Sequence, residues 1–213
     1  MTRLIGIFGS AGFAREVMPL VRSQTKLAED RVVFVDRDPG SPIDGHDVIG
    51  EDAFLRYDGR RQFVVAIADA AVRKRVTGLA LESGAEPFEV RASTSLVHDS
   101  VRIGAGAVLC DHTIITSNVK IGLGLHLNIY SYIAHDCVVG ENVTFAPRVS
   151  CNGNVVIEDG AYLGTGAVLR QGLPDAPLVI GAGAVVGMGA VVTKSVAPGT
   201  TVVGNPAKLF LRT

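Results

Sequence analysis

The sequence has almost no net charge, no long apolar run and few cysteines. Its 20 Lys and Arg residues are balanced by 21 Asp and Glu residues, so it offers no electrostatic footprint for nucleic acid or an anionic membrane. No apolar run approaches the roughly 20 residues that cross a bilayer, and residues 1–9 lack the long apolar region of a signal peptide. The three cysteines are an odd number. Reduced thiols, a cytoplasmic location and no nucleic-acid or membrane partner are therefore expected.

An apolar residue recurs at every sixth position over more than seventy residues. A helix repeats its apolar face near 3.6 residues and a strand alternates at 2, so neither explains this period. A fixed period of six predicts a β-helix built from hexapeptides, in which three hexads close one coil and residues 18 apart stack. The thirteen positions are Val97, Ile103, Leu109, Ile115, Ile121, Leu127, Ile133, Val139, Phe145, Cys151, Ile157, Leu163 and Leu169.

A second inward-facing position follows four residues after each of these markers. The register breaks at residues 171–178, where two prolines predict a loop that leaves the prism, and it resumes at Ile180 for three more hexads. Sixteen hexads, or about five coils, bury a core by stacking on one another. Cys137 and Cys151 fall on inward positions and are expected to be small buried hydrophobes. The compact residues at the second position are Ala107, Thr113, Val119, Ser131, Cys137, Val143, Val149, Val155, Ala161 and Ala167.

The first ninety residues predict a different architecture, a small parallel sheet with helical crossovers. Strands alternate with helices, which is typical of a Rossmann-like α/β fold. Pro19 should shorten or kink the first helix, and Asp69 and Gly84 are the expected N-cap and stop of the second. We therefore expect an α/β domain at residues 1–91 and a left-handed parallel β-helix at residues 92–213. The predicted strands are residues 3–9, 32–36, 62–68 and 87–91, and the predicted helices are residues 13–22 and 69–84.

The turn from Gly9 to Gly12 joins a strand to a helix and is a candidate phosphate site. Small residues let the backbone approach a pyrophosphate at the helix N-terminus, and Asp36 ends the second strand, where such folds place an acid for a ribose or base. The glycine spacing differs from G-x-G-x-x-G, so a tight turn without a ligand is the alternative. Phe13 would cover a ligand or fill the core, and Arg15 would pair with a phosphate or lie on a solvated face.

Four of the five histidines fall on outward positions of the prism, so we expect all four to reach a surface or an interface. They are His98, His112, His126 and His135. His135 precedes Asp136, and an adjacent carboxylate can orient an imidazole that acts as a general base. Stacking by 18 places Gly153 one coil from His135, where a glycine leaves room for a ligand and its N–H can face an oxyanion. No metal is expected, because the histidines lack ligand spacing.

Four motifs in this order resemble one family of hexapeptide-repeat sugar acetyltransferases. They are IGIFGSAGFAREV at residues 5–17, FVD at 34–36, IAHDCVVG at 133–140 and VGNPAK at 203–208. The family contains sialic acid O-acetyltransferases and nucleotide-sugar 4-amino N-acetyltransferases, including UDP-bacillosamine and GDP-perosamine pathway enzymes. The resemblance implies a homotrimer with active sites between neighbouring prisms, a nucleotide held by the N-terminal domain, acetyl-CoA along the prism, and a place in O-antigen biosynthesis.

The resemblance also implies roles for single residues. His135 is the general base, Asp136 its partner, and the Gly153 amide meets the thioester carbonyl. The positions that border the nucleotide are Gly9, Ser10, Ala11, Gly12, Asp36, Ala68 and Asp69. Some relatives carry a second histidine nine positions after the base, where this chain has Thr144, so a CoA contact there changes. The candidates for binding the CoA phosphates are Arg148, Arg170, Lys194 and Lys208.

The reaction implied is acetylation of the 4-amine of a nucleotide-linked 4-amino-4,6-dideoxyhexose, with GDP-perosamine as the first choice. Asp36 can accept hydrogen bonds from guanine or uracil, so UDP and dTDP sugars stay open. Direct attack on the thioester is expected, since no serine or cysteine occupies a nucleophile setting. One alternative is O-acetylation of sialic acid or a related sugar. Another is a non-catalytic trimeric scaffold or sugar-nucleotide sensor.

Overall fold

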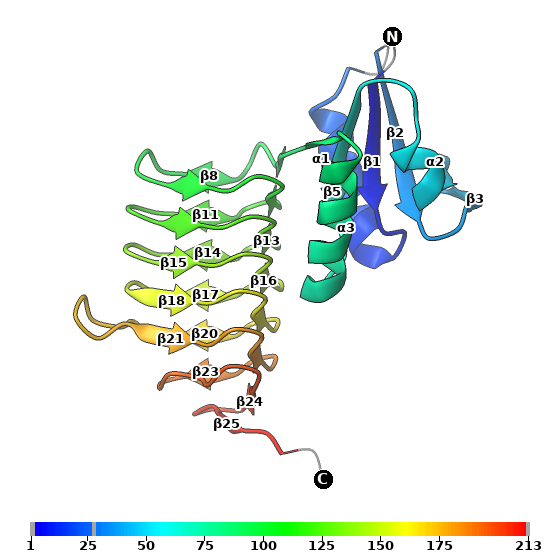
Figure 1. Cartoon of the computed structure of the whole chain (residues 1–213). Helices are drawn as coiled ribbons and strands as arrows, with labels where there is room; N and C mark the ends of the chain where they lie inside the picture. The colour runs from blue at the N-terminus through cyan, green and yellow to red at the C-terminus, as the bar shows by residue number, and fades with distance from the viewer. Residues whose placement is uncertain (1–2, 27–28, 212–213) are drawn as a thin grey trace. The chain divides into compact units, whose positions relative to one another are not determined.

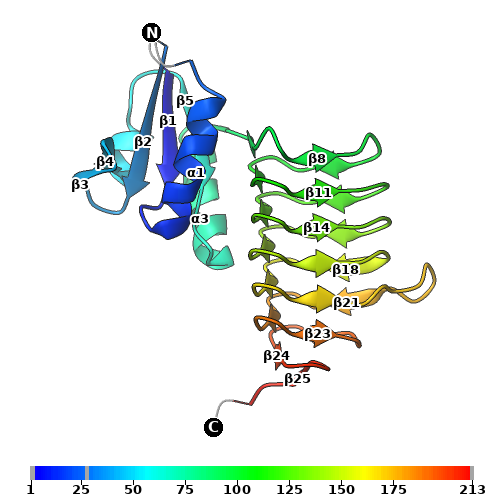
Figure 2. The same cartoon turned by 180° about the vertical axis from the view of Figure 1, so that it is seen from behind.

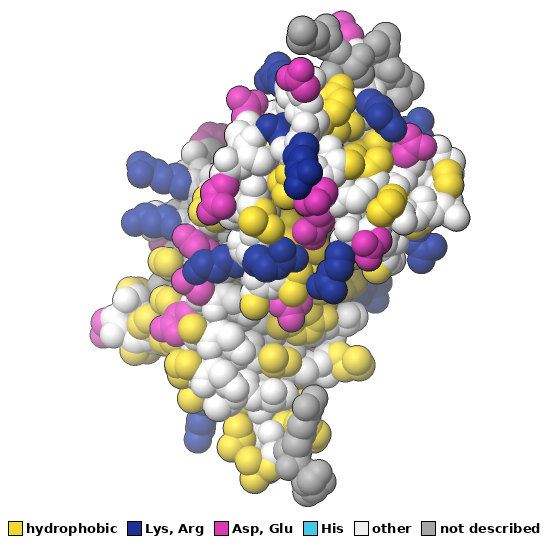
Figure 3. Space-filling view, turned by 45° about the vertical axis from the view of Figure 1, so that its right-hand side comes forward, with side chains coloured by type: hydrophobic (Ala, Val, Ile, Leu, Met, Phe, Trp, Pro, Cys, Tyr) yellow, Lys and Arg dark blue, Asp and Glu magenta, His cyan; other side chains and the backbone are white. Residues whose placement is uncertain are grey.

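The computed structural model describes residues 3–26 and 29–211. The chain divides into two compact units, Met1–Val90 and Arg91–Thr213, which are an α/β sheet and a stack of short parallel strands (Figures 1 and 2). The predicted fold class, an α/β domain followed by a β-helix, is confirmed. No helix in the described residues is long and apolar enough to span a membrane. Figure 3 shows acidic and basic side chains interspersed over one face, as the balanced composition predicts.

The N-terminal unit is a six-stranded sheet with the strand order β3-β4-β2-β1-β5-β6. Every neighbouring pair is parallel except β3 and β4, which are antiparallel. The sheet is therefore parallel as predicted, apart from an antiparallel hairpin at its β3 edge that the sequence prediction did not contain. The elements are β1 (Arg3–Phe8), α1 (Gly12–Ser23), β2 (Asp30–Asp36), β3 (Gly40–Ile43), β4 (His46–Gly50), α2 (Glu51–Leu55), β5 (Arg61–Val65), α3 (Ala70–Glu82) and β6 (Glu86–Pro87).

The β3–β4 hairpin and α2 are the elements that the sequence prediction missed. Asp44 and Gly45 form the turn of the hairpin, with φ angles of 49° and 78°. An Asp-Gly pair with both residues at positive φ is the usual sequence of a tight hairpin turn, so a signal for this hairpin was present. Helix α1 runs through Pro19 to Ser23, and the expected shortening does not occur. Pro19 is on the exposed side of the helix, where water can satisfy the carbonyl that loses its partner.

Three phenylalanines lie in the core of the N-terminal unit. The ring of Phe8 packs edge-to-face on Phe54 at 5.1 Å between ring centroids and on Phe63 at 6.2 Å. Such aromatic pairs add to the free energy gained by burial. A Cβ at Gly6 would lie 2.6 Å from the Phe54 ring. Gly6 therefore serves core packing, and only the later glycines of the turn remain for a ligand.

The second unit is a prism of three parallel sheets. Over the described residues these sheets have eight, six and five strands, and only the last strand of the first sheet, β25, runs antiparallel. Partner residues are 18 apart, as in the pairing of Val108 with His126 and of His126 with Thr144. The first sheet holds β7 (Val90–Arg91), β10 (Val108–Leu109), β13 (His126–Leu127), β16 (Thr144–Phe145), β19 (Tyr162–Leu163), β22 (Val185–Val186), β24 (Thr201–Val203) and β25 (Lys208–Leu209).

The other two faces of the prism repeat the same spacing. One face holds β8 (Leu96–Val97), β11 (Ile114–Ile115), β14 (Tyr132–Ile133), β17 (Ser150–Cys151), β20 (Val168–Leu169) and β23 (Val191–Val192). The other holds β9 (Arg102–Ile103), β12 (Lys120–Ile121), β15 (Val138–Val139), β18 (Val155–Ile157) and β21 (Leu178–Ile180). The motif at residues 203–208 joins β24 to β25 at the C-terminal end of the stack.

The predicted inward positions form one continuous core. From Leu109 onward the marker residues are buried, and so is every predicted residue at the second position. Val97 and Ile103, in the first coil, are partly buried against this core. Buried hydroxyls are satisfied locally, since Thr113 donates to the carbonyl of Cys110 at 2.8 Å and Ser131 to that of Ala146 at 2.9 Å. All three cysteines are buried free thiols.

The predicted loop leaves the prism between β20 and β21 (Figure 1). It ends one residue earlier than predicted, because Leu178 already belongs to β21 and is buried. Across the loop, partners are 23 residues apart instead of 18, as in the pairing of Val156 with Val179. The loop thus inserts five residues and returns the chain to the same register.

Candidate active site

His135 and Asp136 lie within ion-pair distance of each other at the corner that follows β14 in the prism. The His135 Nδ1 lies 2.7 Å from the Asp136 Oδ2, and the two side chains are 47% and 45% exposed. Asp136 has a φ of 58°, the left-handed conformation that a tight corner needs and that Asp and Asn tolerate better than most residues. With Nδ1 held by the carboxylate, the Nε2 of the imidazole is the nitrogen left for a substrate.

Gly153 lies directly against the imidazole of His135. A Cβ added at Gly153 would be 2.4 Å from the His135 Cε1 and 2.5 Å from its Nε2. The stacking prediction is therefore correct in placing these residues together. The structure adds a further reason for glycine at this position, because the imidazole of His135 occupies the space that a side chain would need. The N–H of Asn154 donates to the carbonyl of His135 at 3.0 Å and keeps the two coils in register.

Gly153 also has a backbone N–H that is not used within the described part of the fold. Its carbonyl accepts from the N–H of Gly172 at 2.9 Å, whereas among the described residues no acceptor contacts its own N–H. Buried backbone N–H groups are nearly always paired. This donor is therefore available to an oxygen atom that arrives with a ligand.

Asn118 is a member of this cluster that the sequence prediction missed. Its Nδ2 donates to the Asp136 Oδ1 at 2.6 Å. The hydrogen bonds from Asn118 and then from His135 lower the pKa of Asp136 below its usual value, so the carboxylate stays ionised. The signal that could have identified Asn118 is the same 18-residue stacking that paired His135 with Gly153.

The other prism histidines differ in their exposure. His98 and His112 are exposed as predicted, and the His112 ring stacks on Tyr130 at 5.0 Å between centroids. The prediction for His126 was wrong, because this residue on β13 is only 1% exposed. The hexad position sets the direction of a side chain, but it does not say whether the outer wall is covered at that point. In the described residues no group of three or more His, Cys, Asp or Glu is placed to hold a metal ion.

The Gly9–Gly12 turn and Asp36 lie together in the N-terminal unit. The Ser10 hydroxyl donates to the Asp36 Oδ2, and the Asp36 Oδ1 accepts from the N–H of Arg37 at 2.8 Å. Gly9 has a φ of 108°, and its N–H donates to the carbonyl of Val35 at 2.8 Å. The turn therefore requires glycine at this position for its conformation.

Gly12 is present for another reason. A Cβ at Gly12 would meet nothing within 4 Å, and its φ is not positive, so neither packing nor conformation demands glycine. Ala11 is the N-cap of α1 and provides no side-chain cap. A helix N-terminus beside open space is an arrangement that suits an anion. Phe13 is partly buried and Arg15 is exposed.

The loop after β5 contains Ala68 and Asp69 and is held in place by hydrogen bonds to α3. Asp69 is the N-cap of α3, as predicted, and accepts from the N–H of Val72 at 2.9 Å. The buried guanidinium of Arg73 donates to the carbonyls of Ile67 at 2.7 Å and Ala68 at 3.3 Å. Burial lowers the pKa of Arg73 to about 10, so it stays charged at neutral pH.

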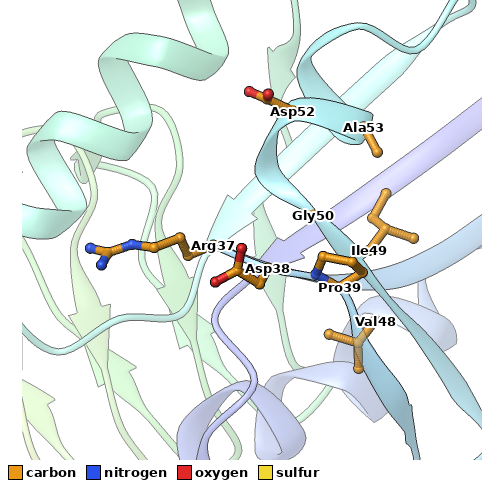
Figure 4. Close-up of a pocket in the computed structure, with 8 residues that line it drawn as sticks. All are labelled: Arg37, Asp38, Pro39, Val48, Ile49, Gly50, Asp52 and Ala53. Atoms are coloured by element: carbon orange, nitrogen blue, oxygen red, sulfur yellow. The ribbon is translucent and has the colours of Figure 1, made fainter.

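A cavity of about 430 Å³ opens beyond the end of β2, next to Asp36. In Figure 4, Val48 and Ile49 form one side of the cavity and Arg37 extends away from them. The cavity thus lies next to Asp36, the acid that ends β2. Its lining consists of Arg37, Asp38, Pro39, Val48, Ile49, Gly50, Asp52 and Ala53.

The candidate CoA residues are spread over the prism. Arg170, Lys194 and Lys208 are exposed. Arg148 lies over the ring of Tyr130, at 5.7 Å from its centroid. Thr144 is 4% exposed, so its side chain offers little surface to a ligand.

Comparisons with known proteins cover both units. Residues 4–78 match the family model of the PglD N-terminal domain. The chain is 46% identical over 215 residues to the GDP-perosamine N-acetyltransferase of Escherichia coli O157:H7, which covers 99% of this chain and 97% of that protein. This likeness therefore extends well beyond the hexapeptide region.

Three solved structures have the same fold over nearly the whole chain. WeeI from Acinetobacter baumannii AYE has a TM-score of 0.94 and 48% identity, covering 98% of this chain and 100% of its own. A histidine variant of perosamine N-acetyltransferase from Caulobacter crescentus, in complex with CoA and GDP-perosamine, has a TM-score of 0.88 and 27% identity, covering 100% and 98%. The acetyltransferase domain of PglB from Neisseria gonorrhoeae FA1090, in complex with acetyl coenzyme A, has a TM-score of 0.87 and 25% identity, covering 99% and 100%.

Proposed function

Because the chain belongs to the family of the GDP-perosamine N-acetyltransferases, we propose that it transfers an acetyl group from acetyl-CoA to the 4-amine of GDP-perosamine. Membership of this family makes the protein an acyltransferase. The observation that carries the finer proposal is the His135–Asp136 pair, whose imidazole lies against Gly153, a residue whose backbone N–H has no acceptor among the described residues. A base and an oxyanion donor side by side are what acyl transfer to an amine requires.

His135 is the general base in this proposal. The neutral 4-amine attacks the thioester carbonyl, and the Nε2 of His135 accepts a proton from the amine nitrogen as the C–N bond forms. The C–S bond then breaks, and the imidazolium returns the proton to the CoA sulfur, so CoA leaves as a thiol and the sugar as an amide. Asp136 holds the Nδ1 proton and stabilises the imidazolium.

The Gly153 amide stabilises the tetrahedral intermediate. A backbone N–H aimed at the oxygen of the thioester becomes a stronger donor as negative charge develops there. Its position against the imidazole supports this role, because the attacked carbonyl must lie within reach of both groups. No covalent enzyme intermediate is needed, since all three cysteines are buried. The thiol of Cys151 also has a raised pKa, owing to its hydrogen bond with Cys137 and to burial.

The N-terminal unit is proposed to hold the nucleotide. The phosphates lie at the Gly9–Gly12 turn and the N-terminus of α1, with Arg15 nearby. Asp36 accepts hydrogen bonds from the ribose or the guanine. The open space at Gly12 and the cavity next to Asp36 support this placement. Ala68 and Asp69 border the nucleotide from the loop that Arg73 holds.

Acetyl-CoA is proposed to lie along the prism of a homotrimer whose active sites are between subunits. The phosphates of CoA pair with exposed basic residues chosen from Arg170, Lys194 and Lys208. Support for assembly comes from outward apolar side chains on one face, where Leu96 is 57% and Ile114 37% exposed. Such side chains in a column favour contact with a second copy. Sedimentation equilibrium of the full chain tests the trimer.

The test of the proposed function is release of free thiol from acetyl-CoA with GDP-perosamine, and with UDP- and dTDP-linked 4-amino-4,6-dideoxyhexoses. We expect turnover with GDP-perosamine and a loss of about 10²–10⁴-fold in kcat for His135→Ala, the usual contribution of a placed base. His98→Ala, an exposed histidine of the first coil, is the matched control. No release with any nucleotide sugar, but release with sialic acid, would replace the proposal by O-acetylation. Full activity of His135→Ala would remove this residue from the mechanism.

A further inference from the structure

The carboxylate that partners His135 is held at both of its oxygens. Oδ2 of Asp136 faces the imidazole at 2.7 Å, and Oδ1 accepts from the Nδ2 of Asn118 at 2.6 Å. We propose that Asn118 is a positioning residue for the reaction, which acts through Asp136 to set the orientation and tautomer of His135. This inference rests on the proposed role of His135 as the general base.

Asn118 is itself fixed by the preceding coil. It lies 18 residues before Asp136 at the same corner of the prism and has a φ of 56°. Its N–H donates to the hydroxyl of Ser100 at 2.7 Å, and the N–H of Asp136 donates to the carbonyl of Ser117 at 3.1 Å. Three successive coils therefore build one ladder of hydrogen bonds, Ser100 to Asn118 to Asp136, that ends at the imidazole.

The chemistry of the amide explains why this contact matters. The Nδ2 of asparagine can only donate, so it favours the ionised carboxylate. The lowered pKa of Asp136, with Asn118 as its largest cause, agrees with this geometry. A carboxylate with one oxygen fixed presents the other to Nδ1 in one direction. That direction keeps the proton on Nδ1 and leaves Nε2 as the acceptor for the amine.

The contact is half exposed, and water can compete with it. A carboxylate released by loss of Asn118 would still reach His135 for part of the time. The expected effect is therefore smaller than that of removing the base. We expect a fall of about 5–30-fold in kcat, which reaches only the lower part of the range of a hydrogen bond to a charged group because the contact is half exposed.

A purely structural role for Asn118 must be separated from this one, since its positive φ is a reason for asparagine in itself. Asn118→Gly keeps the corner conformation, which glycine adopts freely, and removes only the amide. The matched control is His112→Gly, which makes the same exchange at an exposed corner residue with a φ of 58°. We expect the control to keep its kcat and thermal midpoint. Asn118→Gly should keep its thermal midpoint and both KM values and lose kcat.

The decisive kinetic test is a double-mutant cycle with Asp136→Ala. A residue that acts only through Asp136 has nothing to position once that carboxylate is gone, so Asn118→Gly should cost nothing further in the Asp136→Ala background. Equal losses in the two backgrounds would overturn the proposal and leave Asn118 a structural corner residue. An unchanged kcat for Asn118→Gly alone would also overturn it.

A second readout does not depend on activity and separates this inference from the proposed function. The ¹⁵N shifts of the His135 imidazole, assigned by comparison with His135→Ala, report which nitrogen carries the proton. We expect the Nδ1–H tautomer in the wild-type protein and a mixture of tautomers in Asn118→Gly. If the wild-type protein releases no thiol from acetyl-CoA with any acceptor sugar, the proposed function fails, and these shifts still decide the role of Asn118. Identical shifts in the two proteins would refute it.

Discussion

The two units place their candidate residues by different means. In the prism, His135, Gly153 and Asn118 come together because strands repeat every 18 residues and every corner stacks on the next. In the N-terminal unit, Ser10 and Asp36 meet because β1 and β2 are neighbours in a sheet. A periodic fold converts sequence spacing directly into distance. In a parallel sheet with helical crossovers, sequence spacing gives distances only after the strand order is known.

A substitution at Gly153 tests this contrast most directly, and among the substitutions that compare the two units it should have the largest effect. In Gly153→Ala the new Cβ would lie within 2.5 Å of the imidazole of His135. Because that side chain is half exposed, it can rotate away, and the fold should survive. We expect kcat to fall by about 10²–10³-fold, as for loss of a placed base, with a change of only a few degrees in Tm.

Gly78→Ala is the matched control for this substitution. Gly78 lies inside α3, and a Cβ there meets nothing within 4 Å. It should raise stability by about 1 kcal/mol, the gain for alanine over glycine in a helix, without changing kcat. If Gly153→Ala retained wild-type kcat, the contact with His135 would have no part in catalysis.

An intermediate effect is expected at Asp36 in the N-terminal unit. Asp36→Asn keeps the shape that Ser10 contacts but removes the charge. If the carboxylate accepts hydrogen bonds from the nucleotide, the KM for GDP-perosamine should rise about tenfold, with the KM for acetyl-CoA unchanged. Asp47→Asn, an exposed acid on β4, is the control. An unchanged KM for the nucleotide sugar would leave Asp36 as a residue that only ties down the turn.

The sequence predicted the prism almost to the residue and the sheet only in outline. The stacking of His135 on Gly153 followed from spacing alone. The same 18-residue spacing also pairs Asn118 with Asp136, but this pair was missed. Asparagine is common at tight corners, so its residue type alone did not indicate a functional role. The burial of His126 could not be predicted, since the hexad position sets the direction of a side chain and not what covers it.

In the sheet, the missed elements depended on weaker local signals. The Asp44–Gly45 turn was a readable hairpin sequence, but β3, at the sheet edge, has only four residues and three of them are exposed. Helix α2 has five residues, too few for a periodic pattern. Arg73 lies in α3 and holds the loop after β5 through hydrogen bonds to the carbonyls of Ile67 and Ala68. No rule of sequence spacing predicts these tertiary contacts.

The smallest expected effect concerns stability against acid, and it should be confined to the N-terminal unit. Arg3 donates to both carboxylate oxygens of Asp30, at 2.8 Å and 2.6 Å, and this contact lowers the pKa of Asp30. A lowered folded-state pKa adds stability above the unfolded pKa of about 3.9. That stability is lost as the pH falls through the folded value. Asp30→Asn should therefore cost about 1 kcal/mol at pH 7, and the difference from wild type should vanish in strong acid.

Urea unfolding of the full chain can measure this difference. In the described residues all α-helices belong to the N-terminal unit, so the helical circular dichroism signal reports that unit. Asp136 provides the comparison, because its pKa is also lowered but it is exposed at a corner of the prism. Asp136→Asn should leave unfolding of the helical unit unchanged at every pH. A similar loss of unfolding free energy in both variants would mean that the two units unfold as one cooperative structure. The two units would then differ in sequence pattern but not in stability.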